Sequence, residues 1–109
     1  MKSPLQSTGL RIEEVNSIKV FAAKGKPGAI FILGCMYDYG LGVTSNHTEA
    51  VKLIRKAAEQ GNLDAQLRLD FIYKYGHGVP KDRNEALKWR RMATLQRRRE
   101  PLAAGGAAA

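Results

Sequence analysis

The sequence contains very little cysteine and no long hydrophobic run. A single cysteine among 109 residues excludes an internal disulfide framework. The most apolar run covers residues 29–33 and is far shorter than the roughly 20 residues of a membrane-spanning helix. No apolar stretch follows the basic start of the chain, so we expect no secretory signal. Together these absences favour a cytoplasmic protein without a membrane partner.

Acidic and aromatic residues are also scarce. Lysine and arginine number 18 against 10 aspartates and glutamates, which gives a formal net charge of +8. Such a balance favours an anionic partner but says nothing about the fold. Aromatic residues make up only 7% of the chain, so few rings are available to stack on nucleic-acid bases. The hydrophobic content of 44% is that of a globular protein, and the length suits one small domain.

What the chain does contain is an internal repeat of 36 residues. A shift by this length aligns residues 27–60 with residues 63–96, and 13 of the 34 aligned positions are identical. Average composition would give about two identities by chance. The same shift aligns residues 13–25 with residues 49–61 at five positions. The chain is therefore predicted to hold half a repeat unit followed by two whole units.

Each whole unit is predicted to form two helices. Apolar residues at positions 29, 33, 36 and 37, and again at 65, 69, 72 and 73, have the spacing of one helical face. Glycines at positions 40 and 76 follow these helices and favour their termination. Asn46 and Asp82 are the predicted N-caps of the second helices. Each is followed three residues later by a glutamate, which suits the positive end of a helix.

A resemblance to a known family rests on two segments of the first whole unit: Leu33-Gly34-x-Met36-Tyr37-x-x-Gly40-x-Gly42-Val43 and Lys56-Ala57-Ala58-Glu59-Gln60-Gly61-Asn62. These segments resemble the Sel-one-like repeat, a 36-residue relative of the tetratricopeptide repeat. The resemblance implies an all-α fold, namely a short right-handed α–α superhelix of about two and a half helix-turn-helix repeats with a concave face. Members of this family act mostly as adaptors that bind other proteins or peptides, often in bacteria, and are not catalysts as a class.

The repeat also predicts the domain boundaries. We expect a disordered lead over residues 1–10 and a repeat domain over residues 11–96, composed of a half repeat (11–26) and two repeats (27–62 and 63–96). A basic and then Ala/Gly-rich disordered tail should cover residues 97–109. Asp70 replaces the glycine found at position 34, and we expect an arginine of the last helix to pair with it. The small core favours a homodimer or stabilisation by a partner.

The first helices of the two units are expected to line the concave face. Their remaining positions at helical spacing predict a partner-binding groove with an apolar floor and charges at one edge, formed by Phe31, Ile32, Cys35, Asp38, Leu67, Arg68, Phe71 and Lys74. The alternative is that these side chains pack between neighbouring helices. Cys35 has no base partner in the sequence, so we interpret it as a small apolar group rather than a reactive thiol.

Positive charge is concentrated near the end of the chain. Residues 81–100 contain 8 basic and 3 acidic residues, which is +5 of the total +8. We predict a basic patch formed by Lys88, Arg90, Arg91, Arg97, Arg98 and Arg99. Its expected partner is the acidic surface of another protein. Nucleic acid is the less favoured alternative, because no nucleic-acid-binding motif accompanies the charge.

Catalysis finds little support in the sequence. The paired glycines lack the third glycine and the Lys-Ser/Thr ending of a phosphate-binding loop. His47 and His77 have no histidine or cysteine at metal-binding spacing, so we interpret both as lone surface histidines and expect no metal or cofactor. The sequence therefore favours a non-enzymatic adaptor that binds a peptide or helix on its concave face. A small inhibitor or immunity-type protein, and nucleic-acid binding through the last helix, are the alternatives.

Overall fold

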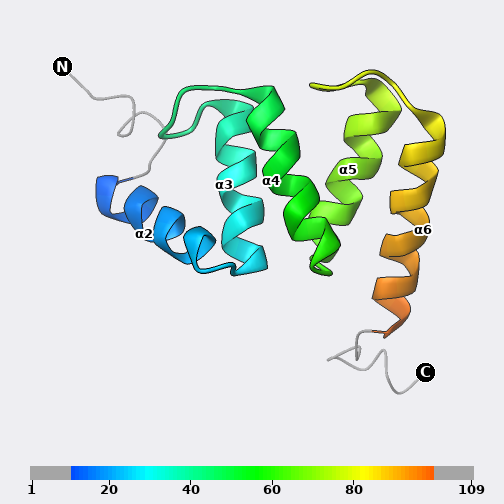
Figure 1. The fold of residues 1–109 in the computed structure, drawn as a ribbon, viewed down its shortest axis with the longest axis horizontal. Helices are drawn as coiled ribbons and strands as arrows, with labels where there is room; N and C mark the ends of the chain where they lie inside the picture. Colours follow the sequence, from blue (N-terminus) through cyan, green and yellow to red (C-terminus); the bar gives the residue numbers. More distant parts are fainter. Residues whose placement is uncertain (1–10, 100–109) are drawn as a thin grey trace.

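The computed structural model describes residues 11–99, and this part of the chain is entirely helical between its connections. Its five helices are α2 (Ile12–Ala23), α3 (Pro27–Tyr39), α4 (His47–Glu59), α5 (Leu63–Tyr75) and α6 (Arg83–Arg99). They lie in a row in which each helix packs against the next one along the chain (Figure 1). This arrangement confirms the expected all-α solenoid. The disordered lead and most of the disordered tail that the sequence predicts lie outside the described residues.

Helices α4, α5 and α6 begin where capping side chains satisfy free backbone N–H groups. The side chain of Asn46 accepts a hydrogen bond from the backbone N–H of Glu49 at 3.0 Å, and Asp82 accepts one from Glu85 at 3.0 Å. Both predicted N-caps are therefore confirmed. Asn62 caps α5 in the same way by accepting from the backbone N–H of residue 65 at 2.8 Å. Each cap of this kind stabilises its helix by about 1 kcal/mol.

Glycines end the first helix of each unit, as the repeat predicts. Gly40 and Gly76 follow α3 and α5 with φ angles of 67° and 72°. This left-handed backbone is costly for residues with a Cβ atom, so glycine allows the chain to leave the helix abruptly. The connections that follow, residues 40–46 and 76–82, lie at the same edge of the row, at the top of Figure 1.

The hydrophobic core lies between successive helices. Its largest fully buried side chains are Trp89, Ile30, Ile54, Leu69 and Ile72. Burial of an aliphatic or aromatic side chain of this size contributes about 1.5–3 kcal/mol. Trp89 is thus a core residue, as its alignment with the apolar position 53 suggests.

Close contact between α3 and α4 depends on Gly34. A Cβ atom built at Gly34 would lie 2.8 Å from Cγ1 of Ile54 and 3.2 Å from the carbonyl oxygen of Ala50. In the second unit, Asp70 occupies the equivalent position. Its carboxylate accepts a hydrogen bond from Nε of Arg90 on α6 at 3.1 Å, which confirms the pairing expected from the sequence.

The last helix extends beyond the predicted end of the repeat domain. We expected the domain to end at residue 96, whereas α6 continues through Arg99. Arginine is a good helix former, and cations in the last turn interact favourably with the helix dipole. The arginines at positions 97–99 therefore belong to α6 rather than to a disordered tail.

Among residues 11–99, no helix has the length and apolar character needed to cross a membrane.

Candidate functional site

Helices α3 and α5 together present exposed aromatic side chains. Tyr39 ends α3, while Phe71 and Tyr75 lie four residues apart on α5, and all three are exposed. The ring centroids of Phe71 and Tyr75 are 5.0 Å apart. Arg68 lies beside them on the same helix. We call the surface formed by Tyr39, Arg68, Phe71 and Tyr75 the aromatic face.

Arg68 connects the two helices of this face. Its guanidinium carbon lies 5.3 Å from the ring centroid of Tyr39 and 5.2 Å from that of Phe71. Its Nη2 atom also donates to the hydroxyl of Tyr39 at 2.5 Å and to Oδ2 of Asp38 at 2.6 Å. A planar guanidinium can stack on rings and bond to a carboxylate at the same time. Arg68 therefore fixes the aromatic side chains relative to a buried anion.

That anion is the centre of a second group of polar residues. The side chain of Asp38 is only 2% exposed, and its Oδ1 atom lies 2.8 Å from Nδ1 of His47 and 2.8 Å from Nε2 of His77. The two imidazole rings are 4.7 Å apart between centroids. We call Asp38, His47, Arg68 and His77 the Asp38 cluster. Asp38 and the two histidines are also the residues of this site that could ligate a metal ion.

Hydrogen bonding keeps Asp38 ionised despite its burial. Burial by itself would raise the pKa of this carboxyl group, because a charged group loses its hydration. Hydrogen bonds from Arg68, His47 and His77 act in the opposite direction and are together stronger, so the pKa of Asp38 lies below its ordinary value. The cluster therefore contains a carboxylate anion at neutral pH.

The fold brings the cluster together from three separate segments. Asp38 is in the last turn of α3, His47 is the first residue of α4, and His77 lies in the turn after α5. Gly78 lets this turn approach α4: its φ is 82°, and a Cβ atom there would lie 3.0 Å from the Cβ of His47. The prediction of two lone surface histidines is therefore wrong.

The sequence contained one indirect signal for this cluster. The glycine turns place the end of each first helix, the start of each second helix and the second turn at one edge of the solenoid. Residues 38, 47 and 77 all belong to these segments. The repeat alignment conceals the relation, because His77 aligns with Leu41 and His47 aligns with Arg83.

The residues predicted to form the groove differ in exposure. Ile32, Leu67, Phe71 and Lys74 are exposed, whereas Phe31, Cys35 and Arg68 are half-buried and Asp38 is buried. Phe31 packs against the hydrophobic core. Burial raises the pKa of the Cys35 thiol, which disfavours the reactive thiolate form. Of the two expected edge charges, Lys74 is exposed, whereas Asp38 is bonded to the flanking Arg68 rather than open to a ligand.

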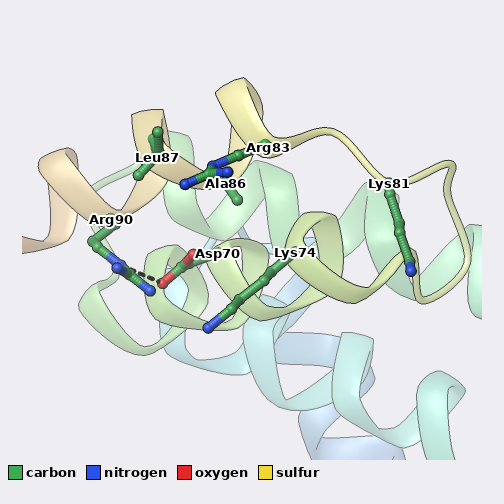
Figure 2. Close-up of a pocket in the computed structure, with 7 residues that line it drawn as sticks. All are labelled: Asp70, Lys74, Lys81, Arg83, Ala86, Leu87 and Arg90. Atoms are coloured by element: carbon green, nitrogen blue, oxygen red, sulfur yellow. Dashed lines mark hydrogen bonds and ion pairs between the residues drawn. The ribbon is translucent and has the colours of Figure 1, made fainter.

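A cationic pocket lies between α5 and the first part of α6. It is lined by Asp70, Lys74, Lys81, Arg83, Ala86, Leu87 and Arg90 (Figure 2). Asp70 is the only acidic residue in this lining, and Arg90 neutralises it (Figure 2). Lys74 and Arg83 occupy the positions that Asp38 and His47 occupy in the first unit. In the second repeat, the positions that correspond to Asp38 and His47 therefore carry positively charged side chains.

The predicted basic patch is divided between paired and unpaired residues. Lys88 forms an ion pair with Glu85 at 3.0 Å, and Arg90 pairs with Asp70. The remaining members are exposed and form no ion pair with any residue between 11 and 99: Arg91, Arg97, Arg98 and Arg99. Within this patch, the unpaired positive charge is therefore concentrated towards the C-terminal end of α6.

Comparison with known proteins matches two segments of the chain, residues 27–62 and 63–96, to the Sel1 repeat. A crystal structure of a Sel1 repeat protein from Oxalobacter formigenes has a TM-score of 0.74 at 38% identity, covering 77% of this chain and 34% of that protein. A protective antigen of uropathogenic Escherichia coli strains, displaying an SLR fold, has a TM-score of 0.74 at 35% identity, covering 85% of this chain and 21% of that protein. None of the curated proteins gives a significant match.

These similarities extend across both helix pairs. The present chain spans about a third and about a fifth of the two solved proteins, which are both bacterial. Sel1 repeats form a scaffold fold and generally mediate protein–protein interactions. The matched segments coincide with the two units that the 36-residue shift identifies in the sequence. This chain therefore belongs to the Sel1 repeat family.

Proposed function

We propose that this chain is an interaction module that binds a peptide or helix of a partner protein on the surface formed by α3 and α5. The observation that carries this proposal is the aromatic face. Tyrosine, arginine and phenylalanine are the side chains that commonly dominate binding at protein interfaces. On this surface the rings of Tyr39, Phe71 and Tyr75 are exposed and are not used to complete the core.

The contacts of Arg68 make the aromatic face rigid before a partner arrives. Arg68 stacks between Tyr39 and Phe71 and is bonded to Asp38, which is itself fixed by two further hydrogen bonds. Side chains that are already ordered lose less conformational entropy on binding. The apolar residues Ile32 and Leu67 extend the exposed surface along the same two helices. Such a surface suits a partner helix with apolar anchors.

Charge around this face favours an acidic partner. Lys74 lies on the same helix as Phe71, and it also lines the cationic pocket between α5 and α6. Charges at the rim of an interface mainly accelerate association and select the partner. The module therefore combines apolar anchoring on α3 and α5 with electrostatic attraction from α5 and α6. An inhibitor or immunity-type role would use the same surface to block its partner.

The experiment compares two single substitutions of similarly exposed residues. Phe71 is 44% exposed on the aromatic face, and Leu95 is 49% exposed on α6. After nuclease treatment, the wild-type chain and Leu95→Ser should retain the same partner from the source cell, while Phe71→Ser should lose it. Equal retention by all three proteins would refute the proposal. Circular dichroism must show that both variants remain folded.

The exposed arginines of α6 support one alternative function, the binding of nucleic acid. Arg91 and the arginines at positions 97–99 form no ion pair with a described residue. If they bind phosphates, affinity should fall steeply with salt, and substitution of these four arginines by glutamate should abolish binding. Binding that survives nuclease treatment and requires Phe71 would instead favour the protein partner.

A further inference from the structure

The chain contains only two histidines, and the fold brings both of them to one buried carboxylate. His47 and His77 lie 30 positions apart and belong to different repeat units. Their nitrogen atoms Nδ1 and Nε2 are each 2.8 Å from the same oxygen, Oδ1 of Asp38. The equivalent residues in the second unit for Asp38 and His47 are Lys74 and Arg83. The cluster is therefore a particular feature of this chain and does not follow from the repeat pattern.

The three side chains offer a geometry close to that of a metal site. Asp38, His47 and His77 each present one ligand atom, and these atoms all lie within 4.8 Å of one another. In a tetrahedral site with ligand bonds of about 2.0–2.1 Å, the ligand atoms are roughly 3.3 Å apart. The present N···O separations would have to widen by about 0.5 Å to reach that spacing. The side chains of His47 and His77 are 49% and 39% exposed, so they have the freedom to make this movement.

The carboxylate is positioned for such a role by Arg68. Nη2 of Arg68 bonds to Oδ2 of Asp38 at 2.6 Å, while Oδ1 faces the two imidazoles. Hydrogen bonds to the outer atom of a ligating carboxylate orient it towards the metal. The guanidinium charge also opposes a second cation. A bound metal must therefore gain most of its affinity from the imidazole nitrogens.

We infer that Asp38, His47 and His77 bind one divalent transition-metal ion, with Zn²⁺ as the expected ion and a water molecule as the fourth ligand. Two imidazoles and one carboxylate suit Zn²⁺, which takes nitrogen and oxygen ligands in tetrahedral geometry. Ca²⁺ and Mg²⁺ require more oxygen ligands than one aspartate supplies. The bound ion would join the α3–α4 corner of the first repeat to the α5–α6 turn of the second. It would thereby stabilise the contact between the two repeats.

The test measures Zn²⁺ binding to the full chain without an affinity tag. Calorimetry should show one ion per chain, and Tm should rise with added Zn²⁺ but not with the same concentration of Mg²⁺. When free Zn²⁺ is ten times its Kd, the folding equilibrium should shift by about 11-fold towards the native state. Because the chain has two histidines, NMR should show the signals of both imidazoles changing together. Co²⁺ should give the visible absorption bands of tetrahedral coordination.

The histidine variants connect these effects to the cluster. His47→Ala and His77→Ala remove exposed side chains, so both proteins should remain folded, and each should bind Zn²⁺ at least about tenfold more weakly. Cys35→Ser is the matched control. Cys35 lies one helical turn before Asp38, and this substitution should leave the affinity unchanged. Asp38→Asn should also weaken binding; if it fails to fold, the two histidine variants decide the question.

Three results would overturn the inference. The first is a wild-type protein whose Tm and imidazole signals do not respond to Zn²⁺. The second is equal Zn²⁺ affinity in the wild type and in a variant with both histidines replaced by alanine. The third is loss of binding in Cys35→Ser with the histidine variants unaffected, which would place the ion at the thiol.

Discussion

The close approach of α3 and α4 at Gly34 leads to a sharp stability prediction. Replacing Gly34 by alanine adds a Cβ atom 2.8 Å from Cγ1 of Ile54 and 3.2 Å from the carbonyl oxygen of Ala50. Ordinary carbon–carbon contacts are about 3.5–4.0 Å, so the two helices must separate by roughly 0.7–1.2 Å. Neither neighbour can move away alone, because Ile54 is fully buried and the oxygen belongs to the backbone.

Two opposing contributions determine the size of the effect. Alanine has a helix propensity about 1 kcal/mol better than that of glycine, which favours the variant. Overpacking of a dense core costs about 1–3 kcal/mol, and contact with backbone places Gly34 at the upper end of that range or above it. The net effect is the difference between the two, so we expect Gly34→Ala to lose about 2–3 kcal/mol of unfolding free energy. For a domain of 60–100 residues, each kcal/mol lowers Tm by about 4–8 °C.

Gly28 provides the matched control in the same helix. A Cβ atom at Gly28 would meet nothing within 4 Å. Gly28→Ala should thus equal the wild type or exceed it by up to about 1 kcal/mol, because alanine restricts the unfolded chain and favours the helix. Urea unfolding followed by far-UV circular dichroism measures both variants. If Gly34→Ala were as stable as Gly28→Ala, the packing argument for the α3–α4 contact would be refuted.

Three further predictions concern interactions away from Gly34. Arg55→Ala should lower the unfolding free energy in urea by about 1–2 kcal/mol, since Arg55 bonds to the hydroxyl of Tyr73 and stacks on that ring and on Trp89; an unchanged urea midpoint would contradict it. Asn62→Ala should cost about 1 kcal/mol through loss of the α5 cap, whereas Asn62→Asp should restore most of it. Asp38 has a lowered pKa in the folded state, so its ionised carboxylate stabilises the fold. This contribution to the free energy of unfolding should be complete above about pH 4 and should disappear as pH falls further. The stability difference between wild type and Asp38→Asn, measured from pH 7 to pH 2, should therefore shrink below about pH 4, and a constant difference would exclude this linkage.

The amino-acid sequence by itself determined the local structure and the repeat. The 36-residue shift, the apolar spacing and the glycine turns correctly indicated the helices of both units. The N-caps at Asn46 and Asp82 were equally predictable from the sequence, because a cap acts on a backbone group three residues away. Gly34 and Asp70 occupy the same repeat position, and their difference predicted the ion pair with α6. All of these features depend on short spacings along the sequence or on the 36-residue repeat period.

Only the tertiary structure decided which of these residues form a surface and which form a site. Phe31 and Cys35 are half-buried, whereas their equivalents Leu67 and Phe71 are exposed. The physical reason is that α5 contacts α3 through Arg68, while no further repeat follows α5 and α6 within the described residues.

The Asp38 cluster was likewise decided by the fold alone. Its residues come from three segments at non-equivalent repeat positions, so neither helical spacing nor the repeat period relates them. They meet because the glycine turns bring the end of α3, the start of α4 and the turn after α5 to one edge of the solenoid. The sequence therefore determined the scaffold, and the stacking of its two units determined the chemistry at that edge.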